Sequence, residues 1–388
     1  MSNSVNGVKE TECCGCGACY QVCPKKSIRM EKNERGFLAP IVDEKACIKC
    51  GACLKVCPEV ARPQFNLVKK SYVAIAENRK LLMTSTSGGV FGALAEAIIS
   101  EGGSVYGCAW DENLCARHIR IEQLNELHQI QKSKYVQSDT NTSFVDVRND
   151  LKQGRKVLYS GTACQIAGLR KFLNGNEGQL ITIEVACHGV PSPGLFQKYI
   201  KWRGEGEKSK VVDMQFRDKE KHKKGEHYMF FLKYKNGKKC YYLSNEDSYY
   251  GSFLEGRTLR ETCYHCIYKE QERVADILLG DYWGIEKEHK NFPARYGASA
   301  VIVASEKGEK LFNRVRSGLR VEDTTFEKIV AHNKSIVSCA SCSAEKKLKS
   351  INITPEELFK ELKPKFSIKK RIKNMIPENV KYMLKRIL

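Results

Sequence analysis

The sequence has no apolar run of about 18 residues, the length that a helix needs to cross a membrane. Its opening residues, MSNSVNGVKETE, have no apolar core, so we expect no secretory signal and a cytoplasmic location. Low-complexity tracts are absent, as are repeats of roughly 20–50 residues outside one cysteine-rich stretch, which argues against a solenoid. What remains is a chain of 388 residues with 42% hydrophobic content, enough for two or three globular domains.

Cysteine is abundant, with 18 residues in a chain that we expect to stay in a reducing compartment, where disulfides are rare. Two runs repeat the spacing C-x2-C-x2-C-x3-C-P, by which bacterial-type ferredoxins hold two 4Fe-4S clusters. In those proteins the fourth cysteine of each run ligates the cluster of the other run. We therefore assign one cluster to Cys13, Cys16, Cys19 and Cys57, and the other to Cys47, Cys50, Cys53 and Cys23.

Two alternative uses of these cysteines are weaker. Zinc also binds C-x2-C pairs, but a zinc site rarely needs a third cysteine two residues on or a Cys-Pro after each run. A disulfide framework requires a secreted chain. Gly15, Gly17 and Gly51 favour the cluster interpretation, because they allow the tight turns that wrap three thiolates around one cubane. We expect Cys14, the extra thiol of the first run, to be a bystander.

After a polar linker at 61–72 the pattern changes to alternating strands and helices. An apolar helix is predicted from Val90 to Ser100, directly after a loop of serine and glycine. Further strand–loop–helix units are predicted at 156–173 and 180–203. Because the carboxyl ends of parallel strands carry the ligand sites of α/β sheets, we expect functional residues in the loops of these units.

Residues 211–243 differ, since their short strands and the Asn236-Gly237 pair predict a small antiparallel excursion with a hairpin. A last helix is predicted at 324–332. The fold class is therefore an α+β ferredoxin-like dicluster domain, then an α/β domain with a small antiparallel excursion, then a basic helical tail. The boundaries that we assign are 1–64, 72–345 and 346–388.

The loop Ser85–Gly89 is a candidate anion site, because the free N–H groups and the dipole of the following helix both face it. A plain helix cap with turn glycines is the alternative. Four cysteines outside the ferredoxin runs are candidates for a third metal site, with burial as small hydrophobic side chains as the alternative for the first two. They are Cys164, Cys187, Cys263 and Cys266, and the pair Cys339 and Cys342 could serve instead.

Taken jointly, the dicluster run and several later motifs resemble the beta-subunit family of coenzyme F420 hydrogenase/dehydrogenase. The resemblance covers roughly residues 8–330, with one mild departure at Ala163, where a proline is common. The motifs that carry it are STSGGVFGAL, KSKYVQS, SGTACQIAGLR, ACHGVPSP, FRDK, CYHC and ADILLGDYWG. Family members include subunits that reduce or oxidise coenzyme F420 and reductases of the chlorophyll pathway.

This resemblance implies an α/β flavin-binding domain that holds FAD behind the dicluster domain. It implies that Ser87, Gly88 and Gly89 hold the FAD diphosphate, and that Lys134, Tyr135 and Thr162 line the flavin site. It also implies a third 4Fe-4S cluster on the cysteines that match the family, which are Cys164, Cys187, Cys263 and Cys266. Asp281 lies near this region by motif, without an assigned role.

The function that the resemblance implies is an oxidoreductase that passes electrons between 4Fe-4S clusters and FAD. It would reduce or oxidise a small substrate or a deazaflavin-type coenzyme, with a ferredoxin or another redox protein as partner. The alternative is a non-catalytic electron-transfer subunit that serves a separate enzyme. A redox sensor is a third hypothesis, which the size of the α/β domain disfavours. His188 and His118 are candidate proton donors, although a structural role is the simpler interpretation of each.

The net charge of +20 is uneven, since residues 363–388 alone hold nine Lys and Arg against Glu378. Within this tail, Val380, Met383, Leu384 and Ile387 share one helical face. A basic amphipathic pattern of this kind is typical of segments that lie on anionic membranes, and we expect peripheral contact with the inner face of the membrane. Docking on the chain's own domain and binding of a partner helix are the alternatives. Nucleic acid is not expected, because the tail has few aromatic residues and no DNA-binding pattern.

Overall fold

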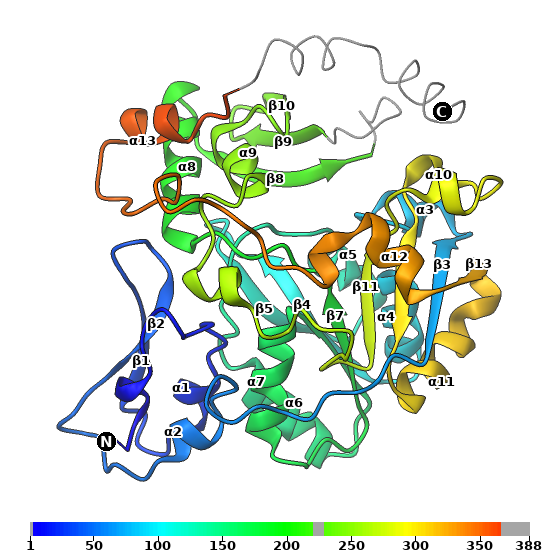
Figure 1. The fold of residues 1–388 in the computed structure, drawn as a ribbon, viewed down its shortest axis with the longest axis horizontal. Helices are drawn as coiled ribbons and strands as arrows, with labels where there is room; N and C mark the ends of the chain where they lie inside the picture. Colours follow the sequence, from blue (N-terminus) through cyan, green and yellow to red (C-terminus); the bar gives the residue numbers. More distant parts are fainter. Residues whose placement is uncertain (1–2, 220–228, 366–388) are drawn as a thin grey trace.

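The computed structural model describes residues 3–219 and 229–365, which form three adjoining parts (Figure 1). An N-terminal cysteine-rich domain packs beside a large α/β domain, and a smaller sheet with its own helices lies above both. None of the helices in these two ranges is long and apolar enough to cross a bilayer. The tail predicted to contact membranes lies outside the described residues from 366 onward, so its role stays a prediction.

The N-terminal domain consists of one hairpin and two short helices. Gly17 and Gly51 precede the helices with φ angles of 79° and 75°, a left-handed conformation that glycine adopts without steric cost. The hairpin pairs its two strands in antiparallel register from Ile28↔Val42 to Lys32↔Leu38. The elements are α1 (Ala18–Val22), β1 (Ile28–Lys32), β2 (Leu38–Val42) and α2 (Ala52–Lys55).

An eight-stranded mixed sheet is the centre of the large domain, with the strand order β13-β3-β12-β11-β7-β6-β4-β5. Its four inner strands β11, β7, β6 and β4 run parallel, and β5, β12 and β13 each pair antiparallel with a neighbour. The strands are β3 (Lys70–Ala76), β4 (Ser104–Trp110), β5 (Ala116–Ile121), β6 (Val157–Gly161), β7 (Leu180–Val185), β11 (Ile277–Asp281), β12 (Ser299–Val303) and β13 (Leu319–Thr324).

Helices cover both faces of this sheet, so its strands carry apolar side chains on both sides. In β3, Tyr72 and Ala74 face one layer, whereas Val73 and Ile75 face the other. The first layer contains α4 (Val90–Ser100) and α11 (Glu306–Val315), and the second contains α6 (Ser143–Lys152), α7 (Ala163–Leu173) and α12 (Phe326–His332). Short helices α3 (Arg79–Met83), α5 (Leu127–Ile130) and α10 (Ile285–Glu288) complete the domain.

The smaller part is a three-stranded antiparallel sheet, ordered β10-β9-β8, with three helices around an aromatic core. Gly237, at φ 87°, allows the tight turn between β9 and β10, as the Asn-Gly pair predicts. The elements are α8 (Pro193–Gly206), β8 (Val211–Asp218), β9 (Met229–Tyr234), β10 (Lys239–Leu243), α9 (Ser248–Leu254) and α13 (Pro355–Leu362).

The sequence predictions agree with this architecture over most of the chain. The dicluster hairpin, the alternating strands and helices, and the antiparallel excursion are confirmed, and the predicted helix from Val90 to Ser100 has those bounds. Strand β13 and helix α6 were not predicted. Within the segment assigned to the tail, Leu358, Phe359 and Leu362 of α13 are buried against the core of the smaller sheet.

The cysteine-rich domain is fixed to the large domain through its backbone carbonyls. Gln137 donates to the carbonyl of Gly15 at 3.3 Å, and Thr140 donates to that of Cys16 at 2.9 Å. The buried guanidinium of Arg260 donates to the carbonyls of Cys13 and Leu38. Charged donors that reach backbone groups across a domain boundary hold the two parts in one orientation.

Replacing Arg260 with methionine removes these charged hydrogen bonds and leaves their carbonyl acceptors buried. We expect the docked state to lose about 2–3 kcal/mol, because hydrogen bonds to charged groups contribute roughly 1.5–3 kcal/mol. The undocked population should rise by about 30-fold or more. The measurement is the rate of anaerobic limited proteolysis in the connecting segment 61–69, which tracks that population.

Arg29→Met is the matched control, because it breaks an exposed ion pair with Glu31 in the same domain. Exposed pairs contribute about 0–1 kcal/mol, so the control should be cleaved at nearly the wild-type rate. Equal cleavage rates for the two variants would contradict the role assigned to Arg260.

Candidate cofactor sites

The first predicted cluster set lies around a cavity of about 150 Å³ on the inner side of the cysteine-rich domain. Cys13, Cys16, Cys19 and Cys57 all line it. Burial raises the pKa of the Cys19 thiol, and the neighbouring thiols of Cys13 and Cys57 raise it further. The cysteine from the second run therefore lies among the three from the first, which is the crossed arrangement that the spacing predicts.

In the second predicted set, Cys23 of the first run lies near Cys53 of the second. Burial raises the pKa of the Cys53 thiol, and Cys23, from the first run, adds to that increase. For Cys23 itself, hydrogen bonds from Ser27 and from two backbone N–H groups outweigh burial and lower the thiol pKa. Cys50 is exposed, whereas the cysteines of the first set are buried or half-buried. This second site thus lies at the surface of the domain.

Within residues 3–219 and 229–365, no three His, Cys, Asp or Glu side chains converge closely enough to hold a single metal ion. A cubane differs from such a site because each of its four protein ligands binds a different iron, so its thiolates surround a volume rather than a point.

A second cavity, of about 560 Å³, contains the four cysteines suggested for a third cluster. Cys164 comes from the first turn of α7, Cys187 from the loop after β7, and Cys263 and Cys266 from the segment 261–266. Burial raises the pKa of Cys266 to about 12, and the neighbouring Cys164 and Cys187 contribute to the increase. Burial also raises the pKa of the Cys263 thiol, and the neighbouring thiols of the other three cysteines raise it further. The fold therefore gathers four thiols from three separate segments.

The other cysteine pair does not join them. The Sγ of Cys339 donates to the backbone carbonyl of Cys266, at 3.6 Å, and Cys342 packs near Gly256. Neither residue lines the four-cysteine cavity.

Two buried polar atoms in this cavity have no hydrogen-bond partner among the described residues. They are the hydroxyl of Tyr268 and one carboxylate oxygen of Glu184, on side chains that are 3% and 4% exposed. Desolvated polar groups of this kind are costly unless something in the site satisfies them. The Tyr268 hydroxyl can donate to a cluster sulfide or a ligating thiolate, so the residues present fit an iron–sulfur cluster.

Cys14, expected to be a bystander, lies at the junction of these sites. The pKa of its thiol is raised, chiefly by the adjacent thiol of Cys16 and by burial, while the nearby thiol of Cys164 acts in the opposite direction. The residue lines the first cluster cavity, the four-cysteine cavity and the large cavity described next. The sequence contains no signal for this position, because Cys164 is 150 residues away along the chain.

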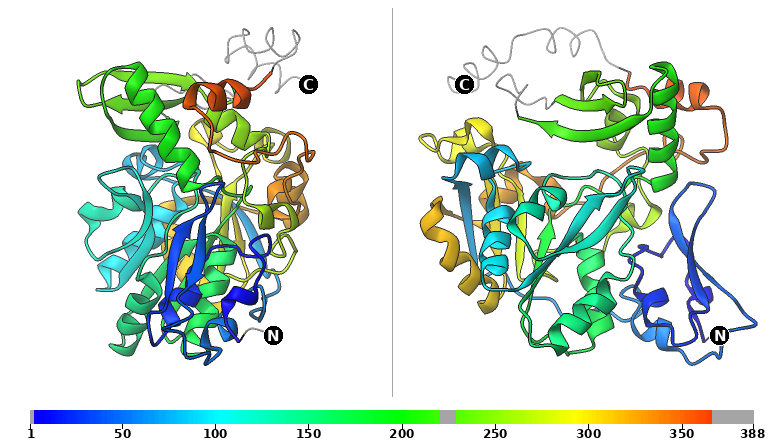
Figure 2. Two further views of the ribbon diagram at one scale, coloured as in Figure 1. Left: turned by 90° about the vertical axis from the view of Figure 1, so that its left-hand side faces the viewer. Right: turned by 180° about the vertical axis from the view of Figure 1, so that it is seen from behind.

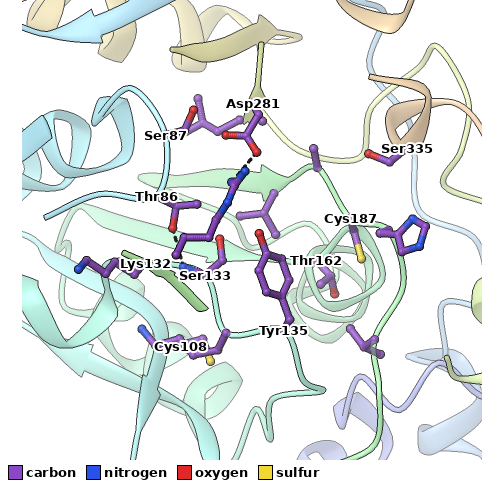
Figure 3. A pocket seen from close by; sticks show the side chains of 18 of the residues that line it. Thr86, Ser87, Cys108, Lys132, Ser133, Tyr135, Thr162, Cys187, Asp281 and Ser335 are labelled. Carbon is purple, nitrogen blue, oxygen red and sulfur yellow. Dashed lines mark hydrogen bonds and ion pairs between the residues drawn. The ribbon is translucent and has the colours of Figure 1, made fainter. Parts of the chain in front are cut away.

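The largest of these three cavities, about 740 Å³, opens at the carboxyl edge of the parallel strands (Figure 3). Loops after β3, β6, β7 and β11 all contribute to its lining. It shares Thr162, Cys164, Cys187 and Ser335 with the four-cysteine cavity, so the two spaces adjoin. A cavity of this size at this edge is the usual location and volume of a cofactor or substrate site in an α/β protein.

The serine–glycine loop borders this cavity, but its polar groups are partly used by the fold. Ser87 donates its hydroxyl to the carbonyl of Ala298 at 2.8 Å, and the N–H of Gly88 donates to Ser299 Oγ at 2.9 Å. Gly89 has a φ of 91° and is followed by the first turn of α4, whose N–H groups have no partner within the helix. The helix N-terminus is therefore the part of the loop available to an anion.

The three other suggested flavin residues also line the cavity. Burial lowers the pKa of Lys134 to about 8, and its ammonium donates to the carbonyls of Gln129 and Gln131. The ring of Tyr135 stacks between aromatic side chains of α9. Thr162 lies 3.2 Å from the Cys164 sulfur through its hydroxyl, at the boundary with the four-cysteine cavity.

The lining of this cavity contains an ion pair that the sequence does not reveal. Arg217 of β8 donates to Asp281, at the end of β11, at 2.6 Å (Figure 3). The two residues come from different sheets, 64 positions apart, so only the fold brings them together. The GDYWG motif thus supplies a carboxylate that holds the smaller sheet against the large domain at the cavity.

The two candidate histidines differ in their surroundings, although both line the cavity. Both ring nitrogens of His118 face hydrogen-bond partners, Ser160 O at 3.0 Å and Ser138 Oγ at 3.2 Å. Burial lowers its pKa to about 4, which keeps the ring neutral at physiological pH. His188 packs edge-on against Phe253, and its Nε2 has no partner among the described residues. Of the two, His188 is the better placed to exchange a proton.

Comparison with known proteins links both ends of this arrangement to redox proteins. Residues 154–328 match the family model for the C terminus of the beta subunit of coenzyme F420 hydrogenase/dehydrogenase, and residues 12–61 match the model for a 4Fe-4S dicluster domain. Among solved structures, the chain is similar to a chain of the F420-reducing [NiFe] hydrogenase complex from Methanosarcina barkeri, with 15% sequence identity and a TM-score of 0.48. That similarity covers 80% of this chain and 94% of the other. No curated protein matches the chain by sequence.

Gly88→Ala tests whether the serine–glycine loop must approach the sheet this closely. An added Cβ would lie 2.2 Å from the carbonyl oxygen of Ala74 and 2.6 Å from the Ser299 nitrogen, both backbone atoms. We expect a loss of about 1–3 kcal/mol in unfolding free energy from this overpacking, measured as a lower Tm. Gly206→Ala, where an added Cβ meets nothing within 4 Å, is the control and should change stability by less than about 0.5 kcal/mol. Equal Tm values for the two variants would show that the loop is not packed in this way.

Proposed function

Since the chain belongs to the coenzyme F420 hydrogenase/dehydrogenase beta-subunit family and carries a 4Fe-4S dicluster domain, we propose that it is an iron–sulfur flavoprotein oxidoreductase. It passes electrons between three 4Fe-4S clusters and FAD, and reduces or oxidises a small substrate or a deazaflavin-type coenzyme. The observation that carries this proposal is the continuity of the three cavities, which all border Cys14, while Cys164 lines the two larger ones.

The largest cavity fits the flavin for three reasons. Its volume of about 740 Å³ lies in the range of cofactor pockets. A helix N-terminus at Gly89 and Val90 offers N–H groups to a diphosphate, and Lys134 supplies a half-buried cation in the lining of the same cavity. Aromatic and aliphatic side chains of α9 give an apolar surface for a ring system.

When bound, FAD would supply the step between one-electron carriers and two-electron chemistry, because a flavin accepts electrons singly or in pairs. The protein's own contribution is placement. Thr162 and Cys164 lie at the wall between the flavin cavity and the four-cysteine cavity, so the distance between the two sites is short. His188, next to Cys187, is the residue that we assign to hold or release a proton.

A second function is favoured by the family itself, whose model describes a subunit. In that alternative the chain carries electrons for a separate partner enzyme and does not turn over a substrate alone. The two functions share every cofactor site and differ only in whether the isolated, reduced protein converts a small substrate.

Anaerobic purification followed by iron, sulfide and flavin analysis tests the proposal. We expect one FAD and about twelve irons per chain, since three 4Fe-4S clusters hold four each. Changing both Cys263 and Cys266 to serine should reduce the iron content to about eight and leave the two ferredoxin clusters in the EPR spectrum.

The double variant of Cys339 and Cys342 to serine is the matched control, because these two residues also form a C-x2-C pair but lie outside the cavity. It should keep about twelve irons. Absence of flavin from the wild-type protein after anaerobic handling would overturn the proposed function, and eight irons in the wild type would remove the third cluster.

Tyr268→Phe tests whether the unpartnered hydroxyl serves the third cluster. Hydrogen bonds to cluster sulfurs stabilise the reduced state, so its removal should lower the midpoint potential of that cluster. The measurement is an EPR-monitored redox titration of all clusters.

Tyr264→Phe is the control, because its hydroxyl already donates to the carbonyl of Gly256 at 2.6 Å. Its cluster potentials should match those of the wild type. If Tyr268→Phe leaves every potential unchanged, the hydroxyl does not contact a cluster.

A further inference from the structure

The two ferredoxin sites differ in the direction that they face. The first lies against the large domain, where Cys16 packs so closely on Gly168 of α7 that an added Cβ would lie 2.8 Å from the Cys16 sulfur. The second belongs to the outer part of the same domain, around Cys23, Cys47, Cys50 and Cys53. In Figure 1 and in the right-hand view of Figure 2 the blue dicluster domain lies at one side of the molecule. An electron that enters from outside therefore meets the second site before the first.

The second site is also the one that reaches the solvent. Cys50 is the exposed cysteine of the chain's described part, and Ile48 next to it is 56% exposed. A thiolate ligand at the surface brings a cluster close to whatever protein touches that surface. The exposed isoleucine beside it gives the apolar contact that the centre of a small interface needs.

Lysines surround this exposed edge. Lys25 and Lys26 follow Cys23, Lys45 and Lys49 lie on either side of Cys47, and Lys55 follows Cys53. All five are exposed, and none of them has an ion-pair partner among residues 3–219 and 229–365. The acids within five residues of these lysines are Asp43, Glu44, Glu59 and Glu31, the last of which pairs with Arg29. Lysines therefore outnumber the unpaired acids, and the edge carries net positive charge.

We propose that this edge, formed by Cys50, Ile48 and the five lysines, is the docking surface for a small acidic redox protein of the ferredoxin type. The inference rests on the proposed function, since it requires a cluster at the second site. Charge complementarity selects the partner, because a positive rim attracts an acidic protein over long distances and orients it before contact. The five lysines have no ion-pair partner among the described residues, and the exposed Ile48 lies next to Lys49 in the chain, between Cys47 and Cys50.

The test is anaerobic binding of a purified acidic two-cluster bacterial ferredoxin to the intact holoprotein, at about 50 mM and about 200 mM salt, where screening differs. For the wild type we expect measurable binding that weakens as salt increases. The double variant Lys25→Glu/Lys45→Glu should bind about tenfold more weakly or worse at low salt, because reversed rim charges repel the partner.

Lys235→Glu/Lys310→Glu is the matched control. It makes the same charge change at two exposed lysines, one in the β9–β10 turn and one on α11, both remote from the dicluster domain (Figure 1). The control should bind within about twofold of the wild type, since exposed charges far from the interface are screened. Equal weakening in the two variants would show a general charge effect and overturn the proposal.

Two further outcomes are decisive. Absence of ferredoxin binding by the wild type would overturn the docking surface. So would binding of anionic lipid vesicles by the wild type that the Lys25→Glu/Lys45→Glu variant loses and the control keeps. Iron and flavin contents are measured on the same samples. Normal iron and flavin contents without ferredoxin binding would reject the docking surface and leave the proposed function intact. Ferredoxin binding by a protein without flavin would reject the proposed function and leave the docking surface intact.

Discussion

The arrangement depends on the close contact between the cysteine-rich domain and helix α7. Cys16 lies against Gly168, where any side chain would collide with its sulfur, and Cys14 lines the same cavities as Cys164, one turn earlier in the same helix. Arg260 secures this contact by donating to backbone carbonyls around the first cysteine run. Because electron transfer requires short distances between centres, a domain that could rotate away would disconnect its clusters from the rest of the molecule. The hydrogen bonds across the boundary therefore have a functional consequence beyond stability.

The large domain adds a second constraint, which is the direction of its strands. Since β4, β6, β7 and β11 run parallel, their carboxyl ends meet at one edge, and the loops that follow them bring cysteine, threonine and aspartate together. The cysteine-rich domain docks beside this edge. The dicluster site, the four-cysteine cavity and the largest cavity are therefore neighbours in space. The smaller sheet covers the far side of the largest cavity and is joined there by the Arg217–Asp281 ion pair.

Much of this could be predicted from the sequence, because local patterns determine it. The cysteine spacing identifies both ferredoxin sets, and apolar runs next to glycine loops predict the strand–helix units. Strand β13 was missed because LRVEDT, on the edge of the sheet, carries three charged residues that resemble a surface segment. Helix α13 was assigned to the tail because its buried face meets α8 and α9, more than 100 residues earlier. Cys14, Arg260 and Arg217 were missed for the same reason, since their partners are distant in sequence and no local pattern marks them.

The central claim is that the inner ferredoxin cluster adjoins a third cluster, which in turn adjoins a flavin. Anomalous diffraction at the iron edge, from crystals grown anaerobically, tests it most directly. The account predicts three iron peaks, with the inner two on either side of Cys14, and flavin density at the carboxyl edge of the parallel strands beyond Cys164. Iron peaks confined to the cysteine-rich domain, with no iron among Cys164, Cys187, Cys263 and Cys266, would contradict it.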